Sequence, residues 1–176
     1  MKSNIVLIGF MGTGKSSIGR RLAAKLHKTF IDTDREIENV TGLSIDQLFN
    51  RFGETRFRSE EELIVKKVSE RRDCIIATGG GVVLNPDNVA CLRQNGTVIC
   101  LTASPQVIHQ RVGRRNRPLL KKDRSPERIE QMLRERDPFY RCADLTIDTT
   151  NFDPDDIIQK IMEFISGGAA VANTES

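Results

Sequence analysis

The sequence predicts an α/β protein in which a parallel β-sheet is covered by helices on both faces. The first observation is that five short apolar segments alternate with segments of helical periodicity. Such alternation is typical of parallel sheets, because each strand returns through a helical crossover. The second observation is that three of the five segments are almost continuously apolar, as strands buried on both faces are. The expected strands are residues 4–9, 29–32, 74–78, 97–101 and 145–148, of which the first, third and fourth are the continuously apolar ones.

Helices are expected between these strands. Ile18, Leu22 and Leu26 recur at intervals of four residues after the first strand, and the segment 53–71 carries a similar repeat. Four of the six prolines follow a side chain that can cap a helix, which is the pattern of a helix whose first residue is proline. These starts are Asn85-Pro86, Ser104-Pro105, Ser125-Pro126 and Asp153-Pro154.

Length and composition fit one folded domain. The chain has 176 residues, 38% of them hydrophobic, and its net charge is only +3. These values allow a sizeable core and exclude a disordered chain. We expect the domain to occupy residues 1–166 and the small-residue segment 167–176 to be a disordered tail.

We expect neither an export signal nor a membrane segment. No apolar run approaches the roughly 20 residues of a membrane helix, and the N-terminal residues do not form a signal peptide. The four cysteines form no Cys-x-x-Cys pair, so we expect structural thiols in a reducing, cytoplasmic compartment. We expect a monomer without a membrane partner, because no exposed apolar stripe is evident.

Positive charge is concentrated in residues 111–124, which hold seven Lys or Arg and one Asp. This block has a charge of +6 and the remainder of the chain −3, since the whole chain is +3. A local basic block favours a local anionic ligand over a nucleic-acid surface. We expect residues 112–124 to form a lid over a triphosphate, with Arg117 reaching the transferring phosphoryl group. The alternative is a solvated basic loop.

The strongest motif follows the first expected strand. Residues 9–16 read GFMGTGKS and match G-x-x-x-x-G-K-[S/T] at every fixed position, with a strand before them and a helix after them. Glycines let the backbone wrap around phosphate oxygens, and the N–H groups at the helix start supply partial positive charge. Lys15 adds a full charge at the β- and γ-phosphates, and Ser16 offers a hydroxyl to Mg²⁺. The motif therefore predicts use of a nucleoside triphosphate.

Two absences narrow the class of enzyme. The guanine-reading pattern N-K-x-D, which GTPases usually carry, does not occur in the sequence. The third expected strand ends at Thr78 and continues into three glycines, without the aspartate that is usual there in motor-type ATPases. A kinase that acts on a small molecule is therefore favoured.

Acceptor-binding residues are expected where the second and third strands end, because the carboxyl ends of parallel strands line the ligand crevice. Asp32 and Asp34 end the second strand. One of these carboxylates can hold hydrated Mg²⁺ and the other can orient a substrate hydroxyl. The alternative is that Asp34 caps a helix that begins at Arg35. The three glycines at 79–81 permit close approach of the backbone to a ligand, or form a loose turn.

Two arginines in helical segments are further candidates. Arg58 lies beside Phe57, and Arg136 lies in the helix expected after Ser125. Either arginine alone fits a solvated surface charge. A pair that converges on one carboxylate supplies the forked donors that bind such a group well, and the sequence leaves that convergence open.

Taken together, these residues resemble those of shikimate kinase over almost the whole chain, from residue 4 to about residue 165. The ordered set of motifs is specific, although each motif after the first is weak alone. The motifs are GFMGTGKSSIGR at 9–20, FIDTD at 30–34, FGETRFRSEE at 52–61, TGGG at 78–81, RPLL at 117–120 and RERDPFYRCAD at 134–144.

The resemblance implies a fold and a reaction. The implied fold is a three-layer α/β/α kinase fold with a phosphate-binding loop, a lid, and a five-stranded parallel sheet in the order 2-3-1-4-5. The implied reaction is phosphorylation of the 3-hydroxyl of shikimate by ATP, in the route to aromatic amino acids. One Mg²⁺ ion is implied as cofactor, with ATP and shikimate as the binding partners.

The resemblance also implies roles on the nucleotide side. Ser16 would bind Mg²⁺, and Asp32 would support the metal through water. Adenine contacts are implied near Arg111 and residues 150–154, with no single residue assigned. The implied nucleotide-binding residues are Gly12, Thr13, Gly14, Lys15, Ser16, Ser17 and Arg117.

On the acceptor side, Asp34 would orient the hydroxyl and act as base, and it forms the implied catalytic set with Lys15 and Arg117. Arg58 and Arg136 would clamp the shikimate carboxylate. The backbone of the glycine segment would contact the ring hydroxyls, through Gly79, Gly80 and Gly81.

Three other functions remain open. A gluconate kinase on the same scaffold would also bind a hydroxy-acid with arginines and an aspartate. A nucleotide-binding protein without turnover would bind ATP, and no acceptor would stimulate ADP release. A nucleic-acid binder rests on the basic block alone and predicts steeply salt-dependent binding; the modest net charge and the single tyrosine argue against it.

Overall fold

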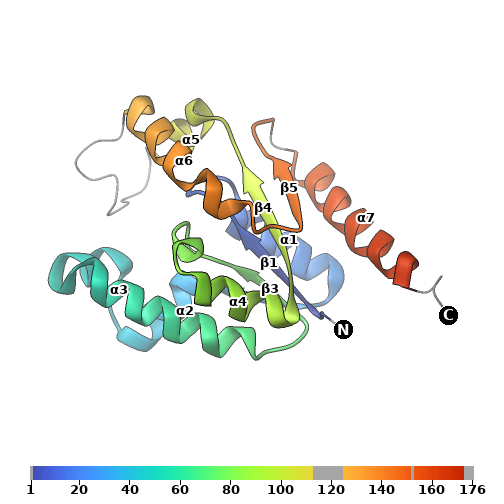
Figure 1. Ribbon diagram of the computed structural model, residues 1–176, viewed down its shortest axis with the longest axis horizontal. Helices are drawn as coiled ribbons and strands as arrows, with labels where there is room; N and C mark the ends of the chain where they lie inside the picture. The colour runs from blue at the N-terminus through green and yellow to red at the C-terminus, as the bar shows by residue number, and fades with distance from the viewer. Residues whose placement is uncertain (1, 113–124, 152, 173–176) are drawn as a thin grey trace.

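The computed structural model describes residues 2–112, 125–151 and 153–172 (Figure 1). Its centre is one sheet of five strands in the order β2-β3-β1-β4-β5, and all four neighbouring pairs are parallel. The strands are β1 (Asn4–Ile8), β2 (Thr29–Asp32), β3 (Cys74–Ala77), β4 (Gly96–Thr102) and β5 (Leu145–Asp148). The strand order and the parallel sheet are as expected from the sequence.

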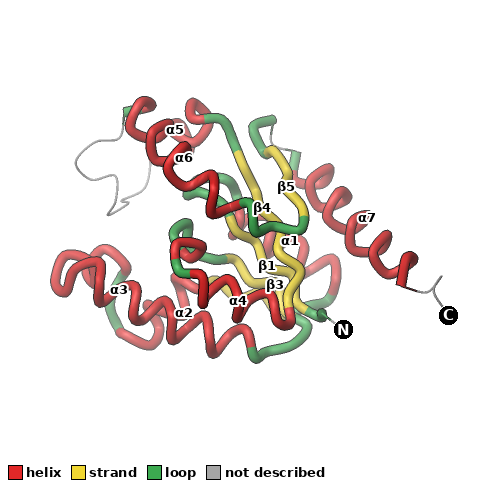
Figure 2. Tube along the Cα trace, viewed as in Figure 1, coloured by secondary structure: helices red, strands yellow, loops and turns green. Residues whose placement is uncertain are grey.

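Helices cover both faces of the sheet, which forms the middle of three layers (Figure 2). One face packs against α1 (Lys15–Leu26) and α7 (Pro154–Ala172). The opposite face packs against the other helices. These are α2 (Thr33–Thr41), α3 (Ile45–Ser69), the short 3₁₀ helix η1 (Val82–Leu84), α4 (Pro86–Asn95), α5 (Pro105–Val112) and α6 (Pro126–Tyr140).

The core alternates along β1, because successive side chains of a strand point to opposite faces. Val6 and Ile8 belong to the cluster that includes α2 to α6, whereas Ile5 and Leu7 belong to the cluster with α1 and α7. Every residue of β1 is buried, which is the physical reason for its continuous apolar run. All four cysteines are free thiols, and burial raises the pKa of Cys100 to about 12.

The first strand ends one residue earlier than the sequence predicts. Gly9 leaves the strand with φ +137°, and a Cβ at this position would lie 2.1 Å from the Leu101 carbonyl oxygen. Only glycine tolerates this close approach of two backbones. The chain therefore turns away from the sheet at Gly9 and enters the phosphate-binding motif.

The four helix starts predicted from proline are confirmed, since α4, α5, α6 and α7 each begin at a proline. The preceding side chains accept hydrogen bonds from main-chain N–H groups of the first turn, as N-caps do. The bonds run from Asp87 N to Asn85 Oδ1 (2.9 Å), Val107 N to Ser104 Oγ (3.4 Å), Arg128 N to Ser125 Oγ (3.2 Å) and Asp155 N to Asp153 Oδ1 (2.9 Å).

Helix α3 starts earlier than the predicted segment 53–71, at Ile45. Ser44 and Gln47 form a capping box at this start, a signal that the apolar repeat did not reveal. The helix is broken at Gly53, whose φ of 79° and ψ of 177° are not helical. The repeat first noticed in the sequence therefore belongs to the second half of a kinked helix.

The C-terminal helix extends further than predicted. Residues 167–172 were expected to be disordered, but α7 continues to Ala172. Three of these six residues are alanine, the residue that favours helices most, and they partly offset the helix-weakening effect of the two glycines. Residues 173–176 and most of the predicted lid at 112–124, with Arg117, lie outside the described residues. No helix in the described part of the chain is long and apolar enough to span a membrane.

Candidate active site

The phosphate-binding motif forms the loop between β1 and α1. Gly12 and Gly14 have positive φ values of 81° and 97°, and Gly14 is the N-cap of α1 without a side-chain cap. Lys15 is buried, and its Nζ donates to the carbonyl oxygens of Gly9 (2.7 Å) and Phe10 (2.8 Å). The ammonium group therefore lies against the main chain of the loop, at the place where this main chain would wrap around phosphate oxygens.

The residues expected to hold Mg²⁺ lie together. Ser16 Oγ, in the first turn of α1, donates to Asp32 Oδ2 at the end of β2 over 2.7 Å. Hydroxyl and carboxylate oxygens are ligands that Mg²⁺ prefers, so this pair fits the ion. Within the described ranges no three His, Cys, Asp or Glu side chains are grouped to hold a metal.

Asp32 is also the N-cap of α2. Its Oδ1 accepts from the Asp34 main-chain N–H at 3.2 Å, and α2 begins at Thr33. The alternative that Asp34 caps a helix beginning at Arg35 is therefore wrong. The cap leaves the Asp34 side chain inside the first turn of α2, facing the third strand's end.

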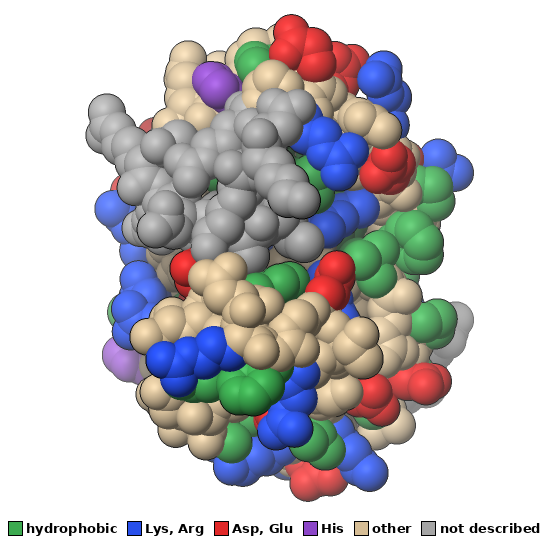
Figure 3. Space-filling model, turned by 90° about the vertical axis from the view of Figure 1, so that its left-hand side faces the viewer, with side chains coloured by type: hydrophobic (Ala, Val, Ile, Leu, Met, Phe, Trp, Pro, Cys, Tyr) green, Lys and Arg blue, Asp and Glu red, His purple; other side chains and the backbone are tan. Residues whose placement is uncertain are grey.

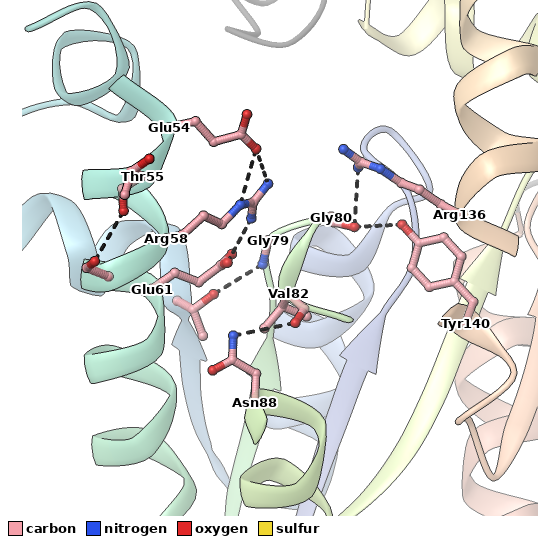
Figure 4. Close-up of polar contacts among 12 residues, drawn as sticks. Glu54, Thr55, Arg58, Glu61, Gly79, Gly80, Val82, Asn88, Arg136 and Tyr140 are labelled. Atoms are coloured by element: carbon pink, nitrogen blue, oxygen red, sulfur yellow. Dashed lines mark hydrogen bonds and ion pairs between the residues drawn. The ribbon is translucent and has the colours of Figure 1, made fainter. Parts of the chain in front are cut away.

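The three glycines at 79–81 are the point where the other candidate side chains meet. A Cβ at Gly79 would lie 2.9 Å from Asp34 Oδ1, and a Cβ at Gly81 would lie 2.5 Å from Arg58 Nη2. Between them, the Gly80 carbonyl oxygen accepts from Arg136 Nη1 at 3.5 Å. Helices α2, α3 and α6 thus each deliver one predicted residue to a turn that has no side chains of its own. Figure 4 shows two of these residues, Arg58 and Arg136, at the turn.

Arg58 is held by two carboxylates that the sequence analysis missed. Its Nη1 donates to Glu61 Oε2 (2.8 Å), and its Nε and Nη2 donate to Glu54 Oε1 (3.3 and 3.1 Å). Glu61 is 1% exposed, and burial raises the pKa of its carboxyl although Arg58 acts in the opposite direction. The spacing of Glu54, Arg58 and Glu61 in the sequence could have indicated these ion pairs, because residues three and four positions apart share a helix face.

Arg136 is buried, which excludes a solvated surface charge. Its guanidinium lies over the Phe10 ring at 5.4 Å from the ring centre. One turn later, the Tyr140 hydroxyl donates to the Gly80 carbonyl oxygen at 2.6 Å. Burial raises the pKa of Tyr140 well above its usual value, so this hydroxyl keeps its proton and remains a donor.

A cavity of about 440 Å³ opens beside Arg58, between α3 and the start of α4. Its volume lies in the range of small-molecule sites. Figure 3 shows basic and acidic side chains together at the hollow on this end of the molecule. The cavity is lined by Glu54, Thr55, Arg58, Ser59, Glu61, Glu62, Asn85 and Asn88.

The nucleotide side of the loop is tied to the segment after β5. Arg111 Nη1 donates to the Gly12 carbonyl (3.2 Å), and Nη2 donates to the Thr149 carbonyl (2.8 Å). The buried Thr149 hydroxyl lies 2.9 Å from the carbonyl oxygens of both Thr13 and Thr102. Thr149 was not predicted, because the contact joins residues 136 positions apart.

Comparisons with known proteins agree on one family. The family model described as shikimate kinase matches residues 11–166. The shikimate kinase of Pelotomaculum thermopropionicum is 50% identical over 163 residues, covering 92% of this chain and 95% of that protein. The shikimate kinase of Thermoanaerobacter pseudethanolicus is 44% identical over 161 residues, covering 91% and 94%.

Solved structures give the same result. A shikimate kinase from Acinetobacter baumannii in complex with shikimate has a TM-score of 0.89 at 36% identity, covering 99% of this chain and 96% of that one. The Aquifex aeolicus shikimate kinase has a TM-score of 0.82 at 34% identity, covering 94% and 98%. A gluconokinase from Sinorhizobium meliloti, at 16% identity and a TM-score of 0.61, shares the fold alone.

Proposed function

Because this chain belongs to the shikimate kinase family, we propose that the site described above binds ATP and shikimate and carries out the family's reaction. That reaction is ATP-dependent phosphorylation of the 3-hydroxyl of shikimate, which gives shikimate 3-phosphate and ADP in the biosynthesis of aromatic amino acids. The observation that carries the proposal is the meeting of Asp34, Arg58 and Arg136 around residues 79–81.

We assign the acceptor's carboxylate to Arg58 and Arg136. Guanidinium groups bind carboxylates through paired, charge-assisted hydrogen bonds. The two arginines come from α3 and α6 and lie on opposite sides of the glycine turn (Figure 4). A small hydroxy-acid held between them would place its ring against the backbone of Gly79, Gly80 and Gly81.

We assign the reacting hydroxyl to Asp34. The 3-hydroxyl oxygen would form a bond to the γ-phosphorus of ATP while the bond from that phosphorus to the β–γ bridging oxygen breaks, which releases ADP. The hydroxyl proton would pass to the Asp34 carboxylate, which accepts its hydrogen bond and orients the oxygen for attack. The transfer would be direct, without a phosphoenzyme.

We assign the phosphates to the loop. Phosphate oxygens would be bound by the backbone of the loop and by the first turn of α1, which includes Ser17. The loop residues are Gly12, Thr13 and Gly14. Lys15 would exchange its carbonyl partners for phosphate oxygens and stabilise the charge that develops during transfer. When bound to Ser16 and, through water, to Asp32, Mg²⁺ would neutralise charge on the phosphates. Arg117 lies outside the described residues, and its contact with the transferring phosphoryl group stays a prediction from the sequence.

The proposal includes a cytoplasmic monomer without nucleic-acid or membrane partners. The low net charge and the free thiols support it. Light scattering coupled to size exclusion tests the monomer, with a mass near 19.8 kDa as the expected result.

The test of the function is acceptor-dependent ADP release with Mg-ATP, comparing shikimate, gluconate and no acceptor. We expect strong release with shikimate alone, which the Lys15→Met variant loses. Lys25→Met is the matched control, because Lys25 is an exposed lysine of the same helix and is expected to leave the rate unchanged. Release with gluconate, or equal slow release without acceptor, would overturn the substrate assignment.

A further inference from the structure

We infer that Tyr140 is a positioning residue for recognition of the acceptor's carboxylate, because its hydroxyl fixes the orientation of the peptide unit between Gly80 and Gly81. The inference deepens the proposed function and rests on it. Tyr140 ends α6, and its hydroxyl donates to the Gly80 carbonyl oxygen over 2.6 Å. Figure 4 shows Tyr140 and Arg136 approaching this oxygen from the same helix.

The Gly80 carbonyl differs from its neighbours in how it is held. The turn itself uses the other two glycine carbonyls, through bonds from Val82 N to Gly79 O (3.2 Å) and from Leu84 N to Gly81 O (3.1 Å). The hydrogen bonds found for the Gly80 carbonyl in the described part of the chain come from α6 instead. The orientation of this peptide unit therefore depends on α6.

The orientation matters for the next N–H group. In a trans peptide the carbonyl of one residue and the N–H of the following residue point in opposite directions. A Gly80 carbonyl turned toward α6 therefore turns the Gly81 N–H away from α6, to the side where Arg58 lies. The Arg58 guanidinium is adjacent to Gly81, since a Cβ there would lie 2.5 and 2.6 Å from its two Nη atoms. A backbone N–H and a guanidinium side by side form a donor set for one carboxylate.

Consecutive glycines need such an anchor. A glycine peptide rotates with little steric cost, because no Cβ restricts the neighbouring dihedral angles. Arg136 is the weaker anchor, since its bond to the Gly80 carbonyl is 3.5 Å, at the limit of hydrogen bonding. Arg136 is also the residue assigned to the substrate. Tyr140 is the donor that keeps the peptide in place while Arg136 contacts the acceptor.

The competing explanation is that Tyr140 only fills the core, where its ring is buried among apolar side chains. The variant Tyr140→Phe separates the two explanations, because it removes one oxygen and keeps the ring. We expect the KM for shikimate to rise roughly three- to tenfold, the effect of one neutral hydrogen bond. The kcat and the KM for ATP are expected to stay within about twofold. An unchanged KM for shikimate in the folded variant would overturn the inference.

A second ligand tests the link to the carboxylate. The methyl ester of shikimate lacks the negative charge, and its affinity can be measured by calorimetry for both proteins. We expect Tyr140→Phe to weaken binding of shikimate but to leave the weaker binding of the ester within about twofold. An equal loss for both ligands would show that Tyr140 does not act through carboxylate recognition, and would overturn the inference.

Ser69→Ala is the matched control. Its hydroxyl is also buried and donates to a main-chain carbonyl, that of Val65 in α3. We expect this variant to leave the KM for shikimate unchanged, and an equal increase in KM would refute a specific role of Tyr140. If the parent protein releases no ADP with shikimate, the proposed function fails and this role fails with it. If the parent is active and Tyr140→Phe is unaffected, only the role of Tyr140 fails.

Discussion

Replacing Arg58 by methionine tests how much the buried ion pair contributes to stability as well as to binding. Methionine keeps much of the apolar stem and removes the guanidinium. The Glu61 carboxylate, 1% exposed, then loses its partner at 2.8 Å. We therefore expect Arg58→Met to destabilise the fold even in the absence of substrate.

The magnitude follows from the burial of the two groups. Removing one partner of a fully buried pair costs about 3–5 kcal/mol, because the other charge stays buried without compensation. The cost here is smaller, since Arg58 is 24% exposed and the charge of Arg136 also acts on Glu61. We expect the free energy of unfolding to fall by about 2–3 kcal/mol. For a chain of this length that corresponds to roughly 4–12 °C in Tm.

The assay is urea unfolding at pH 7, followed by far-UV circular dichroism. The double variant Arg58→Met/Glu61→Gln removes the stranded charge, so we expect it to be more stable than Arg58→Met alone. The KM for shikimate is expected to stay raised in both variants, because both lack the guanidinium. Stability and substrate binding are thereby separated within one set of proteins.

An exposed ion pair supplies the comparison. Arg134 and Glu130 lie one turn apart on α6 at 3.3 Å, with side chains 72% and 52% exposed. Such pairs contribute about 0.5 kcal/mol or less, so Arg134→Met is expected to change stability little. If Arg58→Met costs no more than Arg134→Met, the argument from the buried carboxylate is refuted.

Three further predictions concern the base, the loop and the response to pH. Asp34→Asn is expected to lower kcat roughly 100- to 10,000-fold while the calorimetric affinity for ATP stays within about twofold; a near-parent kcat would exclude Asp34 as the base. Gly9→Ala is expected to cost about 3 kcal/mol or more in urea unfolding, because its Cβ would lie 2.1 Å from the Leu101 carbonyl oxygen. Gly42→Ala, with φ +67° and open space around it, is expected to cost only about 1–2 kcal/mol, and equal costs would contradict the clash. Burial raises the pKa of Glu61 in the folded state. Between the ordinary glutamate pKa of about 4.3 and this raised pKa, the folded state therefore binds more protons than the unfolded state. The contribution of the Glu61 carboxyl to the free energy of unfolding consequently falls as the pH rises through that range. The free energy of unfolding of the parent minus that of Glu61→Gln is therefore expected to decrease from pH 4 to pH 7, and a constant or rising difference would count against the assignment.

Features that depend on neighbouring residues were predictable from the sequence. The apolar runs of the strands, the proline starts of four helices and the phosphate-binding motif each lie within a short stretch of chain. Their boundaries moved by a few residues where a local conformation intervened, as at Gly9. The motifs also led to the family, and the strand order followed from that resemblance rather than from the residues alone.

The arrangement of the acceptor site was decided by the tertiary structure. Asp34, Arg58 and Arg136 were each candidates in the sequence, but a solvated charge was the favoured interpretation for either arginine taken alone. Only the packing of α2, α3 and α6 on one face of the sheet brings these three side chains to the glycine turn. No local pattern encodes that convergence, because it depends on how far apart three helices lie.

The residues that the sequence analysis missed share the same physical reason. Tyr140 contacts the Gly80 carbonyl across 60 positions, and Thr149 contacts the Thr13 carbonyl across 136. In both pairs a side-chain hydroxyl meets a main-chain carbonyl, and any residue type carries such a carbonyl. The sequence by itself determined the elements and the chemistry of the phosphate-binding loop. The folded chain decided which hydroxyls hold the loops in place, because a carbonyl that is buried or partly buried requires a donor.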